Sequence, residues 1–222
     1  MKILALDTAT EACAVALAID DDVLERTVLG RQHAERILEL IDEILAEAQM
    51  PPTALDAIAF GRGPGMFTGL RIGAGITQGI AFAADLPVVP VSTLRVLAQG
   101  QSSDRILAAL DARMGQVYWG CFVRDSDGNM QSFNEERVQS PQDLQLTESH
   151  WVGVGSGWDQ YHSILMQALT PNIEDWVPQV FPSARELAHL GALGLTKGEA
   201  VAAEKAMPVY IRNDIANKPI PV

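Results

Sequence analysis

The chain has 222 residues, 48% hydrophobic and 20% charged, which is enough for one large domain or for two lobes. Its formal net charge is −12 and acidic residues outnumber basic ones in both halves, which excludes a chain that binds nucleic acid through a basic face of its own. The N-terminus lacks the apolar core of a signal peptide, and no apolar run is long enough to span a bilayer. We therefore expect a cytoplasmic protein that does not enter the membrane.

The first half alternates short apolar runs with stretches of helical period. Its predicted strands are residues 3–6, 12–19, 23–29, 57–60 and 86–91. Its predicted helices are residues 33–50, a second helix that Thr68 caps and that runs to about residue 84, and a short third helix that Ser92 caps and that ends at residue 99.

A second apolar hairpin lies near the middle of the chain. Residues 106–122 (ILAALDARMGQVYWGCF) resemble residues 3–17 (ILALDTATEACAVAL), because each has an apolar strand ending in Leu-Asp, a short turn and a second strand. The repeat predicts a duplicated α/β fold with a lobe at residues 1–103 and another at 104–222, each a mixed sheet flanked by helices.

The turn after the first strand resembles a phosphate-binding motif with two departures. In the actin, Hsp70 and sugar-kinase superfamily an Asp-x-Gly-x-Thr hairpin holds nucleotide phosphate. Here Asp7 begins the pattern, but Ala9 occupies the glycine position and Glu11 the threonine position. A methyl group and a negative charge where phosphate would approach favour a structural turn over nucleotide binding.

Six glycines crowd the stretch GRGPGMFTGLRIGAG, residues 61–75, at the start of the second predicted helix. It is not a Walker A motif, because no Lys-Ser or Lys-Thr follows its last glycine. Gly69 and Gly73, and likewise Gly75 and Gly79, are spaced so that each pair lies on one helix face. An interior glycine costs about 1 kcal/mol relative to alanine, so we expect another backbone to approach closely, from this chain or from a partner.

No residue pattern indicates a metal, a cofactor or a catalytic group. The four histidines include no pair three or four residues apart, which excludes a helical zinc pair. Cys13 and Cys121 lie in apolar, strand-like runs and are expected to be buried thiols. We therefore expect no catalytic, cofactor-binding or metal-binding residue in this chain.

Several segments together resemble the TsaB family, bacterial subunits of the tRNA threonylcarbamoyladenosine machinery. They are LDTATEACAVAL, RQHAERILELID, DAIAFGRGPGMFTGLRIGAGITQGIAFAADLPVVPVSTL, LDARMGQVYWG and PVYIRN, and the RGPG-x-FTG-x-R-x-G pattern is the most specific. The resemblance implies an actin/Hsp70-like (ASKHA, ribonuclease H-like) fold and a non-catalytic paralogue of the catalytic subunit TsaD. It also implies a heterodimer with TsaD through helices of the N-terminal lobe, which the ATPase TsaE joins.

The resemblance further implies a substrate. The modified base is the adenosine next to the anticodon in tRNAs that read ANN codons, and TsaC makes the threonylcarbamoyl donor. The catalytic paralogue carries two metal-binding histidines four residues apart, and this chain has Thr93 and Leu97 at those positions, so the metal role does not carry over. The acidic charge agrees with tRNA contacted mainly through the complex.

We predict that the glycine-rich helix and the helix before it form the partner interface, and that the same surface forms a homodimer when the chain is alone. The predicted interface residues are Ile37, Ile41, Leu45, Gly69, Leu70, Gly73, Gly75, Ile76, Gly79 and Ile80. Leucine at Gly73 or Gly75 is expected to weaken the heterodimer. The residues leave open two other classes: a nucleotide-dependent or metallopeptidase-like enzyme, and a regulatory scaffold outside tRNA modification.

Overall fold

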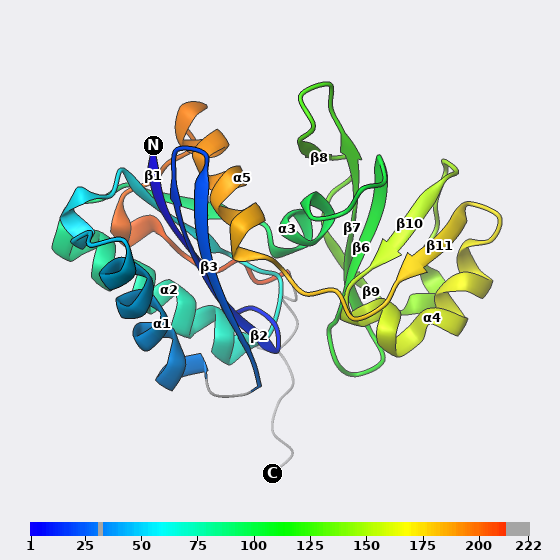
Figure 1. Ribbon diagram of the computed structural model, residues 1–222. Helices are drawn as coiled ribbons and strands as arrows, with labels where there is room; N and C mark the ends of the chain where they lie inside the picture. The colour runs from blue at the N-terminus through cyan, green and yellow to red at the C-terminus, as the bar shows by residue number, and fades with distance from the viewer. Residues whose placement is uncertain (31–32, 212–222) are drawn as a thin grey trace, which may run out of the picture.

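The computed structural model describes residues 1–30 and 33–211, and its backbone forms two sheets side by side (Figure 1). The first sheet holds β1 (Lys2–Asp7), β2 (Ala12–Ile19), β3 (Asp22–Leu29), β4 (Ala57–Gly61) and β5 (Val88–Val91). Its strand order is β3-β2-β1-β4-β5, in which β1, β2 and β3 are antiparallel neighbours and β4 and β5 join in parallel.

The second sheet repeats this scheme. It holds β6 (Arg105–Asp111), β7 (Val117–Arg124), β8 (Met130–Ser132), β10 (Trp151–Val154) and β11 (Ile173–Val177), while β9 (Arg137–Gln139) pairs with β7. The order is β11-β10-β6-β7-β8, with β6, β7 and β8 antiparallel and β10 and β11 parallel. The duplicated α/β fold predicted from the repeated hairpin is therefore confirmed.

Helices cover both faces of the first sheet. The helices are α1 (His33–Glu47), α2 (Phe67–Ala84), α3 (Thr93–Gln99), α4 (Ser156–Leu169) and α5 (Ala184–Thr196), with single 3₁₀ turns at Pro52–Ala54, Pro141–Asp143 and Ala203–Lys205. Helices α1 and α2 lie on one face, and α5 lies on the other (Figure 1). No helix in the described ranges is long and apolar enough to cross a membrane.

The two halves of the chain exchange one helix each. Helix α3, from the first half, packs on β6, β7 and β8 of the second sheet. Helix α5, from the second half, packs on β1, β2 and β4 of the first sheet. The predicted lobes at 1–103 and 104–222 thus each hold one sheet, but the core of each sheet includes a helix from the other half.

The two predicted helix caps have different outcomes. Ser92 caps α3 as predicted, because its side chain accepts a hydrogen bond from the backbone N–H of Arg95. The prediction for Thr68 is wrong, since α2 begins at Phe67 and its N-cap Met66 makes no side-chain hydrogen bond. The Met66 N–H instead donates to the carbonyl of Ala9, so backbone contact with the β1–β2 turn fixes the start of α2.

Candidate functional site at the lobe junction and on helix α2

Asp7, the first residue of the phosphate-like pattern, is enclosed by its own chain. Only 1% of Asp7 is exposed, and its carboxylate accepts hydrogen bonds from the Ala9 N–H at 2.7 Å and the Thr93 hydroxyl at 3.3 Å. A Cβ atom on Gly61 would lie 1.9 Å from Oδ2 of Asp7, so only glycine fits there. Burial raises the pKa of Asp7 to about 6 against the lowering effect of both hydrogen bonds.

The β1–β2 turn faces the β6–β7 turn across the lobe junction. Arg113 of the second turn forms ion pairs with Glu11 of the first at 3.8 Å and with Asp111 at 3.0 Å. The cavity between the two turns measures about 20 Å³, which is space for one water molecule. In this conformation the turns contact each other rather than enclose a ligand-sized space.

The two positions at which the family resemblance implies the loss of a histidine pair lie in the interior. Thr93 is fully buried and donates to Asp7, and Leu97 packs between α3 and the second sheet. Cys13 and Cys121 are free, buried thiols, as predicted. Within the described part of the chain, no three His, Cys, Asp or Glu side chains lie close enough together to hold a metal ion.

The first glycine pair of α2 faces inward, where it meets the β1–β2 turn. A Cβ on Gly69 would lie 1.9 Å from the carbonyl oxygen of Thr8, and one on Gly73 would lie 2.5 Å from the Thr8 hydroxyl oxygen. The same hydroxyl donates to the carbonyl of Gly69 at 2.8 Å. These glycines therefore serve close packing within the chain.

The second glycine pair faces outward. No atom lies within 4 Å of a Cβ built on Gly75 or Gly79, and both residues are exposed. They share one exposed surface, called here the α2 face, which consists of Thr68, Arg71, Gly75, Gly79 and Phe82. The side chain of Phe82 is 84% exposed.

The predicted interface residues divide into a buried set and an accessible set. Six of them are buried inside the chain and cannot contact a partner in this conformation: Ile37, Ile41, Leu45, Gly69, Leu70 and Gly73. The apolar side of α1 packs on the first sheet, so the α1 residues predicted to contact a partner are covered by this chain itself. Of the remaining four, Gly75 and Gly79 are exposed, whereas Ile76 and Ile80 are half-buried against the core.

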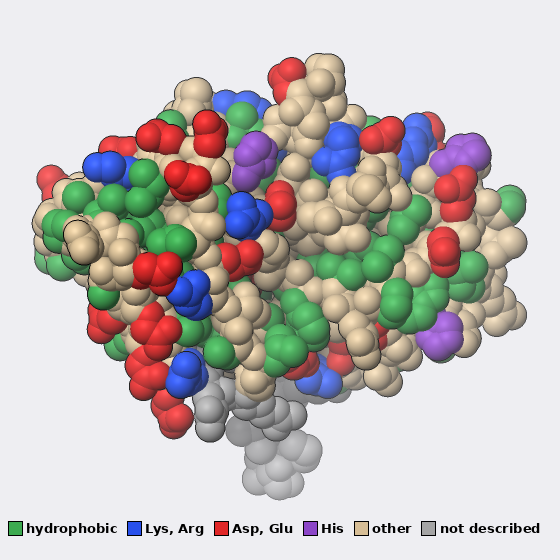
Figure 2. All heavy atoms as spheres, viewed as in Figure 1, with side chains coloured by type: hydrophobic (Ala, Val, Ile, Leu, Met, Phe, Trp, Pro, Cys, Tyr) green, Lys and Arg blue, Asp and Glu red, His purple; other side chains and the backbone are tan. Residues whose placement is uncertain are grey.

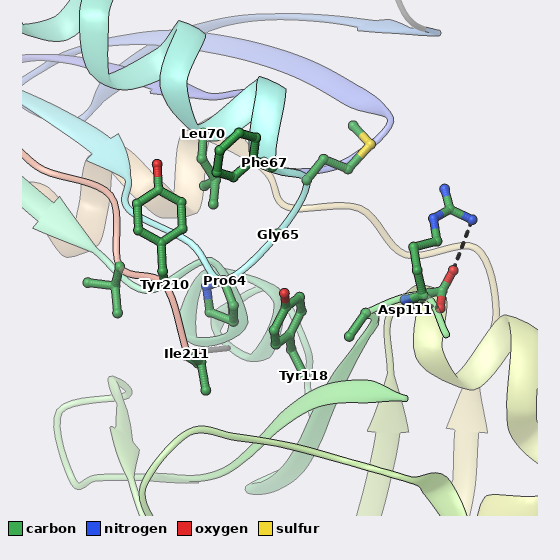
Figure 3. Close-up of a pocket in the computed structure, with 12 residues that line it drawn as sticks. Pro64, Gly65, Phe67, Leu70, Asp111, Tyr118, Tyr210 and Ile211 are labelled. Atoms are coloured by element: carbon green, nitrogen blue, oxygen red, sulfur yellow. Dashed lines mark hydrogen bonds and ion pairs between the residues drawn. The ribbon is translucent and has the colours of Figure 1, made fainter. Parts of the chain in front are cut away.

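A larger cavity of about 210 Å³ opens between the lobes beside the start of α2. Figure 3 shows Phe67 and Leu70 from α2 and Tyr210 from the C-terminal segment on one side of it, with Asp111 and Tyr118 of the second lobe opposite. The rings of Phe67 and Tyr210 lie 5.6 Å apart, tilted by 42°.

The C-terminal segment, residues 206–211, runs along α2. The Gln78 amide donates to the carbonyl of Ala206 at 3.2 Å, and the Arg71 Nε donates to the Tyr210 hydroxyl at 3.3 Å. Sequence reasoning missed this packing, although Arg71 and Tyr210 both lie in segments that carry the family resemblance. Residues 212–222 lie outside the described residues.

Comparison with known proteins gives full-length matches. Residues 27–217 match the TsaD family model, described as tRNA N6-adenosine threonylcarbamoyltransferase. The tRNA threonylcarbamoyladenosine biosynthesis protein TsaB of Escherichia coli (strain K12) is 41% identical, over 100% of this chain and 99% of that protein. The protein of the same name from Haemophilus influenzae is 39% identical, over 100% of this chain and 98% of that one.

Two solved structures share the fold. YeaZ from Pseudomonas aeruginosa is 40% identical, with a TM-score of 0.86 over 95% of this chain and 100% of that one. A second structure, described as an uncharacterized protein with similarity to peptidase YEAZ from Pseudomonas aeruginosa, has a TM-score of 0.88 at 40% identity, over 95% of this chain and 99% of that one.

Proposed function

Because the chain belongs to the TsaB family of tRNA threonylcarbamoyladenosine biosynthesis proteins, we propose that it is a non-catalytic subunit of the complex that makes this modification. The complex modifies the adenosine next to the anticodon in tRNAs that read ANN codons. In it the chain dimerises with TsaD and supports it, and it recruits the ATPase TsaE. With a net charge of −12, it contacts tRNA mainly through its partners.

The observation that carries the proposal is the outward glycine pair on the α2 face. Each helical glycine costs about 1 kcal/mol relative to alanine, and no atom of the described chain needs the space at Gly75 or Gly79. A helix of another protein gains from that space, because small residues let two helix backbones approach closely. We assign the α2 face, with Ile76 and Ile80 at its border, to the contact with TsaD.

The geometry near Asp7 supports a non-catalytic role. Asp7 is held by the chain's own groups, Thr93 lies against it, and the cavity between the two lobe turns holds about one water molecule. A chain without its partner leaves the α2 face uncovered, so it forms a homodimer through the same surface.

Reconstitution of the reaction tests the proposal. Purified TsaC, TsaD and TsaE with tRNA, ATP, bicarbonate and labelled threonine are assayed with and without this chain. We expect incorporation of threonine into tRNA only when the chain is present, and neither modification nor ATP turnover by the chain alone. Equal incorporation without the chain would overturn the proposed function, and ATP or peptide hydrolysis by the chain alone would reopen an enzymatic one.

The interface assignment predicts the effect of leucine at Gly75. The added side chain enters space that a partner helix needs, and overpacking of about 1 to 3 kcal/mol lowers affinity for TsaD about tenfold or more. Gln167→Leu, an exposed position on α4, is the matched control and keeps wild-type affinity. Sedimentation velocity with TsaD measures both, and wild-type affinity of folded Gly75→Leu would contradict the assignment. Gly73→Leu is no longer a suitable test, because Gly73 packs against Thr8.

A further inference from the structure

Arg71 is the single charged residue of α2, and it lies on the exposed α2 face. Its guanidinium stacks on Phe67, with Cζ 3.8 Å from the ring centroid. Its Nε donates to the hydroxyl of Tyr210 at 3.3 Å. The guanidinium therefore has an aromatic support and a hydrogen bond that both come from its own chain.

This support is itself held in place. Phe67 and Tyr210 contact each other as a tilted ring pair. The segment that carries Tyr210 is fixed by the hydrogen bond from the Val209 N–H to the carbonyl of Arg62 at 2.9 Å. A stacked arginine has lost much of its rotamer freedom before any partner arrives, which lowers the entropic cost of binding through it.

Arg71 lacks a carboxylate partner in the described ranges. Six other arginines form ion pairs with Asp or Glu there: Arg26, Arg36, Arg105, Arg113, Arg124 and Arg137. No ion pair among residues 1–30 and 33–211 includes Arg71, although the chain has 28 acidic residues for 16 basic ones. Its Nε donates to Tyr210, and no hydrogen bond within the described ranges uses the two terminal nitrogens of its guanidinium, which can therefore bind an anion.

We infer that Arg71 is an anchor for a carboxylate of the protein that packs on the α2 face. The inference rests on the proposed function, because it uses the same surface. Arg71 precedes Gly75 by four residues, so a helix on the glycine pair meets Arg71 about 6 Å along α2. A Glu or Asp of that helix binds the terminal nitrogens as a bidentate, charge-assisted pair.

The surrounding charge favours protein over RNA as the source of this anion. The exposed positions of the neighbouring helix α1 are largely acidic, and Figure 2 shows red side chains gathered over it. These acidic residues are Glu35, Glu39, Asp42, Glu43 and Glu47. They repel a phosphate backbone along its whole length, whereas a protein helix can place one carboxylate at Arg71 and basic side chains opposite α1.

Substitutions at Arg71 test the anchor. Arg71→Gln removes the charge, and we expect affinity for purified TsaD to fall at least tenfold by sedimentation or calorimetry, with a smaller dependence on salt. Arg71→Lys keeps the charge but loses the planar fork, so we expect intermediate affinity. Charge reversal at a TsaD helix carboxylate, combined with Arg71→Glu, is expected to restore binding that each single reversal abolishes.

The outcomes separate the anchor from the proposed function. If wild-type chain fails to bind TsaD, the proposed function is overturned and the anchor with it. If wild type binds and folded Arg71→Gln binds equally well, only the anchor is overturned. Two further results overturn the anchor. One is an equal loss of affinity for TsaD in Asp214→Asn, because the carboxylate would then belong to this chain. The other is weaker tRNA binding by Arg71→Gln while its binding to TsaD stays unchanged.

Discussion

At the scale of single residues, Asp7 is a carboxylic acid whose burial disfavours its charged form. Its pKa is about 6 in the folded chain, against 3.8 when unfolded. The folded state therefore binds more protons than the unfolded state between about pH 4 and pH 6. Protonation of Asp7 favours the folded state, so the free energy of unfolding falls as pH rises through this window. Above pH 6 the charged, buried carboxylate lowers the free energy of unfolding by up to about 3 kcal/mol.

Asp7→Asn tests this directly. The amide keeps an acceptor for the Ala9 N–H and carries no charge at any pH, so we expect the variant to be more stable than wild type at pH 8 by about 1 to 3 kcal/mol. The gain should shrink toward pH 4.5. Urea unfolding at several pH values measures it, and a difference that does not change with pH would contradict the assignment of the raised pKa to Asp7.

The two glycine pairs of α2 give a matched comparison. Gly69→Ala places a methyl group 1.9 Å from the carbonyl oxygen of Thr8, so we expect a loss of about 1 to 3 kcal/mol or more. Gly75→Ala meets no atom within 4 Å and gains helix propensity, so we expect a more stable monomer by about 0.5 to 1 kcal/mol. Urea unfolding measures both variants, and effects of equal sign would show that the pairs do not differ in role.

At the scale of elements, the start of α3 is tied to the second lobe through Ser92. Its hydroxyl accepts from the Arg95 N–H and donates to the carboxylate of Glu136, which lies between β8 and β9. Burial raises the pKa of Glu136, and the Ser92 hydroxyl and the Arg62 guanidinium partly oppose that rise. One side chain thus caps a helix and joins the two lobes.

Ser92→Ala removes both contacts. A lost cap lowers stability by about 1 kcal/mol, and a half-buried carboxyl without its donor adds a similar or smaller loss, so we expect about 1 to 3 kcal/mol in total. Glu136→Gln keeps an acceptor for the hydroxyl and leaves the cap intact, so its effect is expected to be smaller. Chemical denaturation compares the two variants, and wild-type stability of Ser92→Ala would exclude this double role.

The elements also show what the sequence predicts and what it leaves out. Period and turn residues located the strands of both hairpins, because local patterns determine them, and the family resemblance drawn from the motifs is confirmed by full-length relatives. Which glycine pair faces inward and which faces outward could not be predicted, because both pairs lie at helical spacing in an almost uncharged helix. Only contact with Thr8, about 60 positions earlier in the chain, separates them. The contact between Arg71 and Tyr210 joins residues 139 positions apart, so it likewise could not be predicted from local sequence patterns.

At the scale of the whole molecule, the exchanged helices couple the two lobes. Helix α5 buries one face of the first sheet, including Ile3, Ala59 and Val89. A Cβ on Gly191 of α5 would lie 2.4 Å from the Cβ of Ala59, so the helix and the sheet are in close contact. A fragment of residues 1–103 lacks this helix and exposes that apolar face, so we expect it to remain unfolded or to aggregate.

The coupling makes a prediction for the unfolding of the full chain. All four tryptophans lie in the second half, so their fluorescence reports on the second lobe, while far-UV circular dichroism reports on both. We expect the two signals to change in one coincident transition in urea. Gly191→Val disturbs the contact between α5 and the first sheet, because the added side chain would meet Ala59 and Ile3, and it should lower both midpoints together. Separate transitions, or a fluorescence midpoint that Gly191→Val leaves unchanged, would mean that the lobes unfold independently despite the exchanged helices.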